Sequence, residues 1–371
     1  MSTGRVMLAG GGSAGHSIPC VAVAEAIAAQ RPECEFLFVG STRPVDRGLF
    51  ERLKLPHVLL DAQPFPYRPS WALVRSYMAL RRARGRMREI IAEFRPDAVF
   101  STGGYVSAPV VTEAARARVP VVLHASDAKP GRANLYLARH TATVTVAYQA
   151  AAAFFTGSQV VVAGQPLRRS ILHASRERGR AALGAPPEAT VLLALGGSQG
   201  ADSINRAVLD SLPHLLSIPG LHVVHFTGAA HEERVREAAV SVPSAKGAAY
   251  RCHGYVDEPG DLLAAGDLVV SRCGSSSLAE FMCLGLPCIA VPLAIAGGHQ
   301  RYNVQPLLDE GAAVLVDNER LSGAVLAGVV SDLLADPQRL TRMSRAARSL
   351  AAPQAADRIA DLLVRHLPSE A

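Results

Sequence analysis

The stretch Gly10-Gly11-Gly12-Ser13-Ala14-Gly15-His16 decides the fold class, because it follows a short apolar segment at residues 5–8. A second loop of the same kind, Gly196-Gly197-Ser198-Gln199-Gly200, follows the apolar segment 190–195. A helical pattern comes after each loop. Both loops therefore mark a strand, a tight turn and a helix, an arrangement in which free backbone N–H groups and the helix dipole favour phosphate. The echo predicts two similar halves within one chain.

Short apolar segments alternate with helical patterns along the rest of the chain. Further strands are expected at 35–39, 98–101, 119–124, 141–147, 222–227, 268–271 and 288–292. This alternation is typical of parallel sheets covered by helices on both faces, and 371 residues exceed what one core usually fills. We expect an α/β fold of two Rossmann-like, doubly wound parallel-sheet domains facing a deep cleft. The first domain should hold residues 1–164 and a final helix at about 353–371, and the second residues 165–352.

The composition suits a globular protein that binds anions. Hydrophobic residues make up 49 % of the chain, and 38 Lys and Arg against 32 Asp and Glu give a net charge of +6. This mild excess fits phosphates or acidic lipid headgroups and does not require nucleic acid. Six cysteines without a CxxC pair indicate reduced thiols rather than disulfides or a zinc site. Because no signal peptide or uninterrupted membrane span is evident, we expect a cytoplasmic location.

Two more glycine-bearing segments follow expected strands, at Gly103-Gly104-Tyr105-Val106-Ser107 and Gly274-Ser275-Ser276-Ser277. The carboxyl ends of parallel strands are where α/β sheets bind ligands, so four such ends suggest an extended phosphorylated substrate. The alternative for any one loop is a tight turn without a ligand. The sequence contains neither a GxxxxGK[ST] loop nor an Asp-x-Asp pair, which disfavours a P-loop ATPase and a metal-dependent sugar transferase of the single-sheet type.

Three side chains in these segments carry candidate chemistry. His16 should lie in the first turn of a helix, whose positive end favours a neutral imidazole that can act as a general base, or it merely orients the loop. Glu280 follows the serines by one helical turn and could bind a ribose diol, or be a solvated helix residue. Arg168, after Gly164-Gln165-Pro166, could reach a diphosphate, or be a surface arginine.

A basic amphipathic segment spans residues 68–88, with seven arginines and no acidic residue. As a helix it would present an apolar stripe beside basic side chains, the pattern of a segment on an anionic membrane surface. Its alternative is a core helix with a solvated basic face, and nucleic acid is a weaker third interpretation that we do not adopt. The membrane residues expected here are Trp71, Val74, Arg75, Met78, Arg81 and Arg82.

The motifs together resemble those of the MurG family of peripheral membrane glycosyltransferases over nearly the whole chain. The resemblance rests on Gly10–His16, Gly103–Pro109, Gly164–Arg168, Gly196–Ala201, Gly274 with Ala279-Glu280, and His299-Gln300 with Asn303. It implies a GT-B fold whose second domain holds UDP-GlcNAc and whose first domain holds lipid I, the undecaprenyl-linked acceptor. The product would be lipid II for peptidoglycan, made without cofactor or metal at the cytoplasmic face of the cell membrane. Other cell-wall synthesis proteins are further expected partners.

The resemblance also implies roles for individual residues. His16 would deprotonate the 4-hydroxyl of the acceptor sugar, which attacks the anomeric carbon and inverts it. The residues implied for UDP-GlcNAc are Ser13, Ala14, Gly15, Arg168, Ser198, Gln199, Gly200, Val256, Ser275, Ser276, Ser277, Glu280, Gln300 and Asn303. Those implied for the acceptor and its diphosphate are Gly103, Gly104, Tyr105, Ser107 and His124.

One segment departs from the family pattern and keeps alternatives open. Where the family has HEQN, this chain has His124-Ala125-Ser126-Asp127, so Asp127 is a second candidate for the base. The change also allows a related transferase with another lipid acceptor. A UDP-GlcNAc 2-epimerase shares the twin-domain fold and is an alternative of a different reaction class. A non-enzymatic partner of wall-synthesis proteins is the last alternative.

Overall fold

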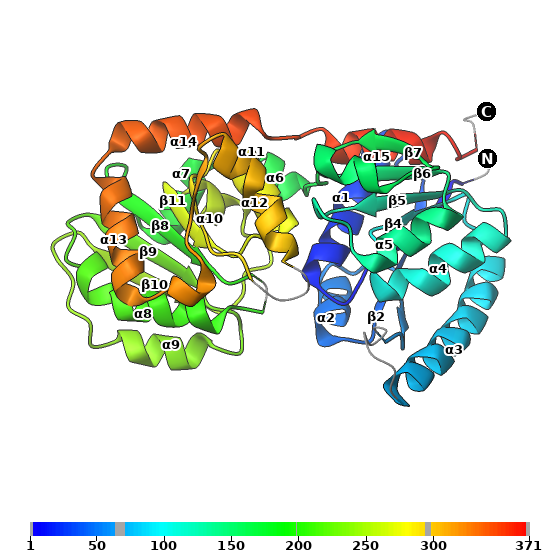
Figure 1. Ribbon diagram of the computed structural model, residues 1–371, viewed down its shortest axis with the longest axis horizontal. Coiled ribbons are helices and arrows are strands. Elements are labelled where there is room, and N and C mark those ends of the chain that lie inside the picture. The colour runs from blue at the N-terminus through cyan, green and yellow to red at the C-terminus, as the bar shows by residue number, and fades with distance from the viewer. Residues whose placement is uncertain (1–2, 64–70, 198, 294–297, 369–371) are drawn as a thin grey trace. The chain divides into compact units, whose positions relative to one another are not determined.

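The computed structural model describes residues 3–63, 71–197, 199–293 and 298–368 (Figure 1). The chain divides into two compact units. Unit 1 comprises Met1–Arg168 and Ala352–Ala371, and unit 2 comprises Arg169–Ala351. Unit 1 is therefore built from two separate stretches of the chain.

Unit 1 is built on a parallel seven-stranded sheet. Its first six strands follow the Rossmann order 3-2-1-4-5-6, and a seventh strand is added at the edge. Their near-continuous apolar character fits strands that are covered on both faces. In spatial order the strands are β3 (His57–Leu60), β2 (Glu35–Ser41), β1 (Arg5–Ala9), β4 (Ala98–Ser101), β5 (Val121–Ala125), β6 (Thr143–Val146) and β7 (Gln159–Val162).

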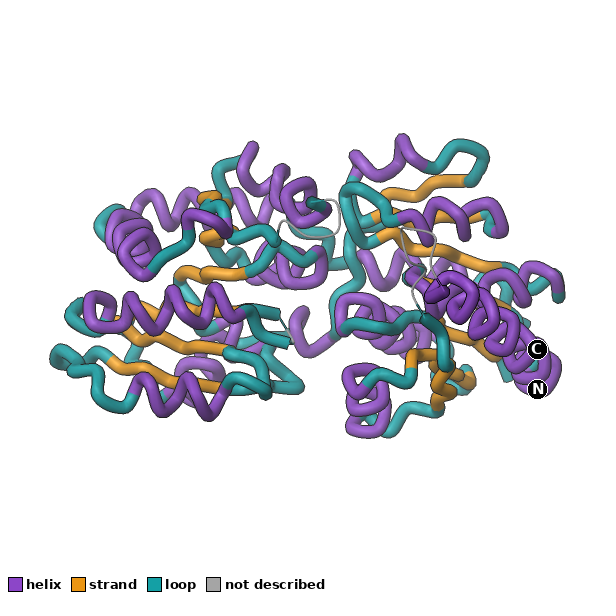
Figure 2. Tube along the Cα trace, turned by 60° about the horizontal axis from the view of Figure 1, so that its bottom comes forward, coloured by secondary structure: helices purple, strands orange, loops and turns teal. Residues whose placement is uncertain are grey.

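Helices cover both faces of this sheet (Figure 2). Alternate residues of β1 enter two different cores, because successive side chains of a strand point to opposite faces. Val6 and Leu8 pack with the α1 side, whereas Met7 and Ala9 pack with the α3 and α4 side. The helices of unit 1 are α1 (Ala14–Gln30), α2 (Pro44–Arg52), α3 (Trp71–Phe94), α4 (Gly104–Arg116), α5 (Arg132–Leu137), the short η1 (Ala138–His140) and η2 (Gln149–Phe154), and α15 (Ala355–Val364).

The last helix completes the core of unit 1, where α15 lies beside α1 (Figure 1). Ile359, Ala360 and Leu363 of α15 are fully buried in the same cluster as Val23 and Ile27 of α1. Residues near the carboxyl terminus therefore help to pack α1, the helix that follows the first glycine loop.

Unit 2 repeats the Rossmann order in a parallel six-stranded sheet. In spatial order its strands are β10 (Ala249–His253), β9 (Leu221–Phe226), β8 (Thr190–Leu195), β11 (Leu268–Ser271), β12 (Cys288–Ala290) and β13 (Ala313–Leu315). Its helices are α6 (Arg169–Leu172), α7 (Arg176–Leu183), α8 (Asp202–Leu215), α9 (Glu232–Ala239), α10 (Gly260–Ala264), α11 (Ser275–Leu284), α12 (His299–Asp309), η3 (Asn318–Arg320), α13 (Gly323–Leu334) and α14 (Pro337–Ser349). The prediction of two Rossmann-like α/β domains is confirmed.

Candidate functional site

The glycine loops lie where the strand order of each sheet reverses, the point at which open α/β sheets bind ligands. In unit 1 the order reverses between β1 and β4, so residues 10–13 and 102–104 flank the switch point. In unit 2 it reverses between β8 and β11, flanked by residues 196–201 and 272–274. We call residues 10–13 loop 1 and residues 196–201 loop 2.

Loop 1 is glycine-rich because other segments approach its backbone closely. A Cβ on Gly10 would lie 2.4 Å from the Thr102 hydroxyl oxygen. Gly12 has φ +92°, and a Cβ there would lie 2.7 Å from the Tyr105 hydroxyl oxygen. The guanidinium of Arg43 lies 5.6 Å from the centre of the Tyr105 ring and donates to the Gly12 carbonyl at 3.3 Å. Tyr105 therefore packs directly against loop 1.

His16 lies in the first turn of α1, as expected from the sequence. The Thr102 hydroxyl donates to the His16 carbonyl at 2.9 Å, which ties this turn to the end of β4. On the other side, the ring Nε2 lies 3.6 Å from where a Cβ on Gly104 would be. The ring Nδ1 is buried and has no hydrogen-bond partner among the described residues. The imidazole thus sits at the switch point with an uncommitted nitrogen.

His124 and Ser107 support this region from below the surface, since both are fully buried in this structure. The Ser107 hydroxyl donates to the Gly103 carbonyl at 2.6 Å. The His124 ring pairs with the Thr145 hydroxyl through Nδ1 and with the Gln165 carbonyl oxygen through Nε2, both at 3.0 Å. Both ring nitrogens are used within the protein, so here His124 positions its neighbours rather than facing a substrate.

The His124 ring is held in its neutral form. Burial lowers its pKa to about 4, the bond to Gln165 opposes this, the charge of His16 lowers the pKa further, and Asp127 raises it. Because Gln165 offers a carbonyl oxygen, Nε2 carries the proton and Nδ1 accepts from Thr145. Asp127, the alternative base, is half-buried just after β5, and Arg168 is buried at the end of unit 1.

Asn134 is a contributor to the site that the sequence did not reveal. Its side-chain amide donates to the His124 carbonyl at 3.2 Å. Its side-chain oxygen lies only 1.6 Å from where a Cβ on Gly103 would be. Gly103 has φ +79°, so both its backbone and its surroundings require glycine. A single asparagine within α5 carries no pattern that predicts such a contact.

Loop 2 interlocks with the turn that follows β9. A Cβ on Gly200 would lie 2.0 Å from the Thr227 carbonyl oxygen, and one on Gly228 would lie 2.6 Å from the Gln199 backbone. Gln199 is exposed, and Gly200 has φ +77°. Ser198, expected at the diphosphate, lies outside the described residues.

A buried polar network fixes the Thr227 carbonyl against loop 2. The Asn205 side chain donates to that carbonyl at 3.0 Å and accepts from the His225 ring at 3.0 Å. The other nitrogen of His225 pairs with the Tyr250 hydroxyl at 3.0 Å. Burial lowers the pKa of His225 to about 4, so the ring is neutral and Tyr250 can donate to it. Sequence analysis missed this network because its members lie on separate elements.

The second flank of this switch point is formed by the start of α11. Gly274 precedes the helix in an extended conformation, and no side chain caps the first turn. Ser275 is buried, while Ser276 and Ser277 are half-buried. Glu280 is half-buried one turn later, where its carboxylate can face a ligand at the helix start.

Arg272 adds a positive charge at the end of β11 that the sequence analysis did not assign. Its guanidinium donates to the Ser203 hydroxyl at 2.7 Å, the Asn318 side-chain oxygen at 2.8 Å and the Val291 carbonyl at 3.2 Å. Burial lowers its pKa, with the charges of Cys273 and Glu319 opposing the shift. A half-buried cation with neutral hydrogen-bond partners, beside the start of α8, favours an anionic ligand.

Gln300 and Asn303 hold the backbone of the strand ends. The Gln300 side-chain oxygen accepts from the amides of Cys273 at 3.2 Å and Leu293 at 2.9 Å. Asn303 is fully buried and donates to the Cys273 carbonyl at 3.3 Å. Among the described residues, only the side-chain oxygen of Gln300 has a recorded hydrogen bond, and the buried Asn303 holds the same segment from beneath. Val256 is half-buried in the turn after β10.

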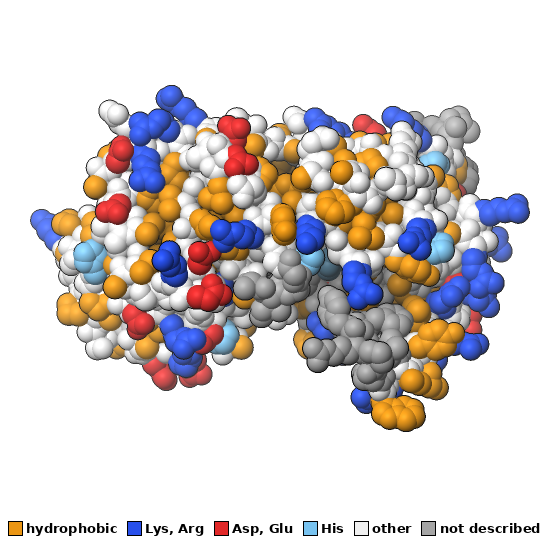
Figure 3. All heavy atoms as spheres, in the orientation of Figure 1, with side chains coloured by type: hydrophobic (Ala, Val, Ile, Leu, Met, Phe, Trp, Pro, Cys, Tyr) orange, Lys and Arg blue, Asp and Glu red, His pale blue; other side chains and the backbone are white. Residues whose placement is uncertain are grey.

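Helix α3 has a buried face and also an exposed apolar end beside basic side chains, so it shows features of both alternatives that the sequence left open. Ala79, Ala83, Met87 and Ile90 form a buried face. Figure 3 shows exposed hydrophobic side chains beside basic ones at the amino-terminal end of this helix. These exposed side chains are Trp71, Val74, Tyr77 and Met78, of which Trp71 is 84 % exposed, and we call them the α3 tip. Arg75, Arg81 and Arg82 are exposed as well.

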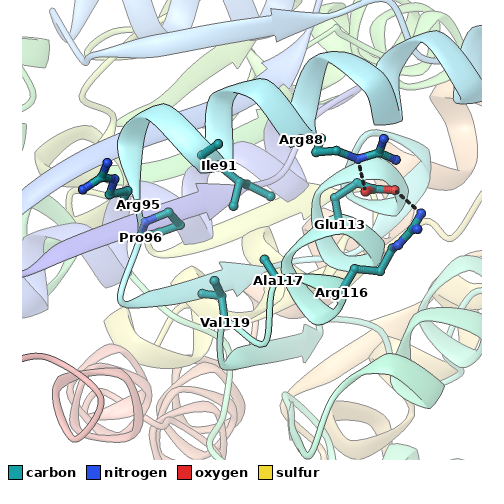
Figure 4. A pocket seen from close by; sticks show the side chains of 9 residues that line it. Arg88, Ile91, Arg95, Pro96, Glu113, Arg116, Ala117 and Val119 are labelled. Atoms are coloured by element: carbon teal, nitrogen blue, oxygen red, sulfur yellow. Dashed lines mark hydrogen bonds and ion pairs between the residues drawn. The ribbon is translucent and has the colours of Figure 1, made fainter.

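Two hollows lie at the amino-terminal edges of the sheets, away from the switch points. One of about 490 Å³ lies between the carboxyl ends of α3 and α4 (Figure 4). There Glu113 pairs with Arg88 and Arg116 beside an apolar floor that includes Ile91 and Val119. Another, of about 810 Å³, precedes β8 and β11 in unit 2. Neither contains the expected site residues.

The described residues hold neither a membrane-spanning helix nor a metal cluster. In residues 3–63, 71–197, 199–293 and 298–368, no helix is both long and apolar enough to cross a bilayer. Within the same ranges, no group of three or more His, Cys, Asp or Glu side chains is arranged to hold a metal ion.

Comparison with family models and curated proteins gives a consistent picture. Residues 6–146 match the glycosyltransferase family 28 N-terminal domain, and residues 191–359 match the glycosyltransferase family 28 C-terminal domain. A relative from Desulforudis audaxviator is 36 % identical, covering 97 % of both chains. One from Paenarthrobacter aurescens is 37 % identical, covering 97 % of this chain and 95 % of its own. Both are named UDP-N-acetylglucosamine–N-acetylmuramyl-(pentapeptide) pyrophosphoryl-undecaprenol N-acetylglucosamine transferase.

Solved structures separate this family from the epimerase alternative. MurG from Acinetobacter baumannii matches with a TM-score of 0.75 at 25 % identity, covering 98 % of this chain and 100 % of that one. A UDP-GlcNAc 2-epimerase from Neisseria meningitidis matches with a TM-score of 0.67 at 13 % identity, covering 97 % and 100 %, which shows a shared fold alone. The epimerase alternative is therefore not favoured. With near-full-length identity above 30 % to its transferases, the chain belongs to the MurG family of N-acetylglucosaminyltransferases.

Proposed function

We propose that the protein transfers N-acetylglucosamine from UDP-GlcNAc to the C4 hydroxyl of N-acetylmuramic acid in undecaprenyl-pyrophosphoryl-MurNAc-pentapeptide. The substrate is lipid I and the product is lipid II for peptidoglycan. The observation that carries the proposal is the near-full-length identity with transferases whose name states this donor and acceptor. Unit 1 would bind the acceptor and unit 2 the donor.

In this reaction His16 takes the proton of the acceptor hydroxyl. The oxygen then attacks the anomeric carbon of GlcNAc from the face opposite UDP, and the bond from that carbon to the diphosphate breaks. UDP leaves with the bonding electrons, and the new linkage is β. The place of His16 in the first turn of α1, at the switch point of unit 1, supports this role.

For the donor, unit 2 supplies positive and neutral groups in place of a metal ion. Loop 2 and the uncapped first turn of α11 offer backbone N–H groups to the diphosphate. Arg272, which donates to Ser203 in the first turn of α8 just after loop 2, adds a cation. Glu280 would bind the ribose hydroxyls, and the amide nitrogen of Gln300 would bind a GlcNAc hydroxyl.

The decisive experiment measures UDP release from UDP-GlcNAc with a short-chain lipid I analogue, against a reaction without acceptor. Acceptor-dependent release and a β-1,4-linked disaccharide product are expected. His16→Asn should lower kcat by about 1,000-fold with unchanged UDP affinity, whereas the exposed His366→Asn should match the wild type. UDP-GlcNAc binding without transfer would point instead to another lipid acceptor, with His124 to Asp127 as the segment responsible.

We also propose that the protein works as a peripheral protein at the cytoplasmic face of the cell membrane. The α3 tip places a tryptophan, a tyrosine and a methionine beside Arg75, Arg81 and Arg82, which suits an interface with anionic lipid. Lipid I is embedded in that surface, so docking there brings the acceptor within reach. Contacts with other cell-wall synthesis proteins remain a prediction.

A further inference from the structure

A buried carboxylate lies beneath loop 1. Asp46 of α2 is fully buried. Its Oδ2 accepts from the amide of Gly12 at 2.6 Å and that of Ser41 at 2.9 Å, and also from the Ser41 hydroxyl. Its Oδ1 accepts from the Ser17 hydroxyl at 2.6 Å. One side chain therefore joins loop 1, the end of β2 and the first turns of α1.

This carboxylate lies close to the start of α1, because it bonds to loop 1 and to a side chain in the first turns of that helix. The start of a helix attracts an anion, and α1 has no acidic residue in its first turn and no side-chain cap from Ser13. Asp46 supplies that negative charge from α2. It also explains Gly11, because a Cβ there would lie 2.6 Å from the Asp46 Oδ2.

The acidic residue at the start of α8, the helix that follows loop 2, has other partners. Asp202, in the first turn of α8, is paired instead with Arg206 and Arg234. The carboxylate bound to loop 1 thus comes from another helix, α2, whereas Asp202 lies on α8 itself.

We propose that Asp46 is a positioning residue for the base, because its bonds to the Gly12 amide and the Ser17 hydroxyl hold the turn that carries His16. The inference deepens the proposed function and rests on it for the role of His16. Ser17 follows His16 directly, and its bond to Asp46 fixes the turn that carries the imidazole.

The test compares Asp46→Asn with Glu51→Gln, an exposed acid on the same helix whose carboxylate makes no bond to loop 1. In Asp46→Asn, one oxygen becomes an N–H₂ group that faces other donors, so the turn shifts. Its kcat should fall by about 100-fold, as for a catalytic group misplaced by about 1 Å. The KM for UDP-GlcNAc and the Kd for UDP should stay within about twofold, and Glu51→Gln should equal the wild type.

Two results would overturn the proposal. One is a folded Asp46→Asn protein that keeps its kcat within about twofold. The other is markedly tighter UDP binding by this variant, because that would mean the carboxylate had been repelling a bound phosphate at loop 1.

A spectroscopic arm separates this inference from the proposed reaction. The ring ¹⁵N signals of His16, assigned by loss in His16→Asn, should shift in Asp46→Asn and not in Glu51→Gln. If the wild type releases no UDP with the lipid I analogue, the proposed function fails while this arm still tests the hold on His16. Should Asp46→Asn not fold, Ser17→Ala removes the short bond to Asp46 together with the longer contacts to the Gly10 and Ser13 carbonyls. An unchanged kcat with unshifted His16 signals would refute the inference.

Discussion

Replacing Glu113 by glutamine should loosen α3 from α4. The Glu113 side chain is 2 % exposed and pairs with Arg84 at 2.6 Å, Arg88 at 3.2 Å and Arg116 at 3.7 Å. Arg84 and Arg88 belong to α3, so this carboxylate ties α3 to α4, the helix that begins at Gly104. Glutamine keeps the shape but leaves three cations facing a neutral group.

The expected loss follows from how exposed each partner is. Arg84 is 35 % exposed and lies between the surface and buried cases, so its pair should contribute about 1 kcal/mol. Arg88 and Arg116 are 64 % and 62 % exposed, which limits each to about 0.5 kcal/mol. Glu113→Gln should therefore lower the free energy of unfolding of unit 1 by about 2 kcal/mol, or its Tm by about 4–8 °C.

The loss should depend on pH. Burial raises the pKa of Glu113, but bonds from Arg84 and Arg88 outweigh it and hold the pKa below the ordinary 4.5. A lowered pKa in the folded state means that the stabilisation is complete above 4.5 and disappears as the pH falls through the folded value. Wild type and variant should differ at pH 7 and converge in acid.

Calorimetry combined with hydrogen exchange of α3 and α4 peptides measures the effect where it should occur. Glu89→Gln is the matched control, because its pair with Arg86 joins side chains that are 71 % and 63 % exposed. That change should cost less than about 0.5 kcal/mol. Equal transitions and equal α3 exchange in wild type and Glu113→Gln at pH 7 would refute the reasoning.

Three further outcomes are expected. Gly103→Ala should lower the free energy of unfolding of unit 1 by about 3 kcal/mol in chemical denaturation, because Gly103 has φ +79° and an added Cβ would meet Asn134. Gly131 has open space around it, so Gly131→Ala should leave the free energy of unfolding unchanged. Trp71→Ser with Met78→Ser should weaken sedimentation with phosphatidylglycerol vesicles at least tenfold without changing UDP affinity, and equal sedimentation would exclude the α3 tip as the docking surface. Transferase activity should withstand EDTA, whereas a loss restored by added Mg²⁺ would contradict a donor site built from helix ends and Arg272.

The central strands could be predicted from the sequence and the edge strands could not. β1, β4, β5, β8 and β11 are buried apolar runs, so their composition reveals them. The strands β3, β7, β10 and β13 are the edge strands of the two sheets. They are short and half-exposed, so they carry mixed side chains without a clear hydrophobic period. The sequence predicted doubly wound sheets without a strand order, and the structure then places the glycine loops at the two switch points.

The site was only partly predictable for a related reason. His16 and Glu280 follow local patterns, a glycine loop and a helix start, that a sequence displays directly. Asp46 and Asn134 act across elements, and nothing in their own neighbourhood distinguishes them from surface residues. His124 and Asn303 stand in the expected motifs, yet their burial gives them supporting contacts that a motif alone does not specify.

The discontinuity of unit 1 has a consequence for how the chain is made. Unit 2 is one continuous stretch, Arg169–Ala351, and can fold as soon as it leaves the ribosome. Unit 1 begins first but waits for α15, whose Ile359 and Leu363 fill the cluster under α1. Until then, the helix that carries His16 lacks part of its packing. The half of the enzyme that is synthesised first is thus finished last, because unit 1 is incomplete until α15 has been made.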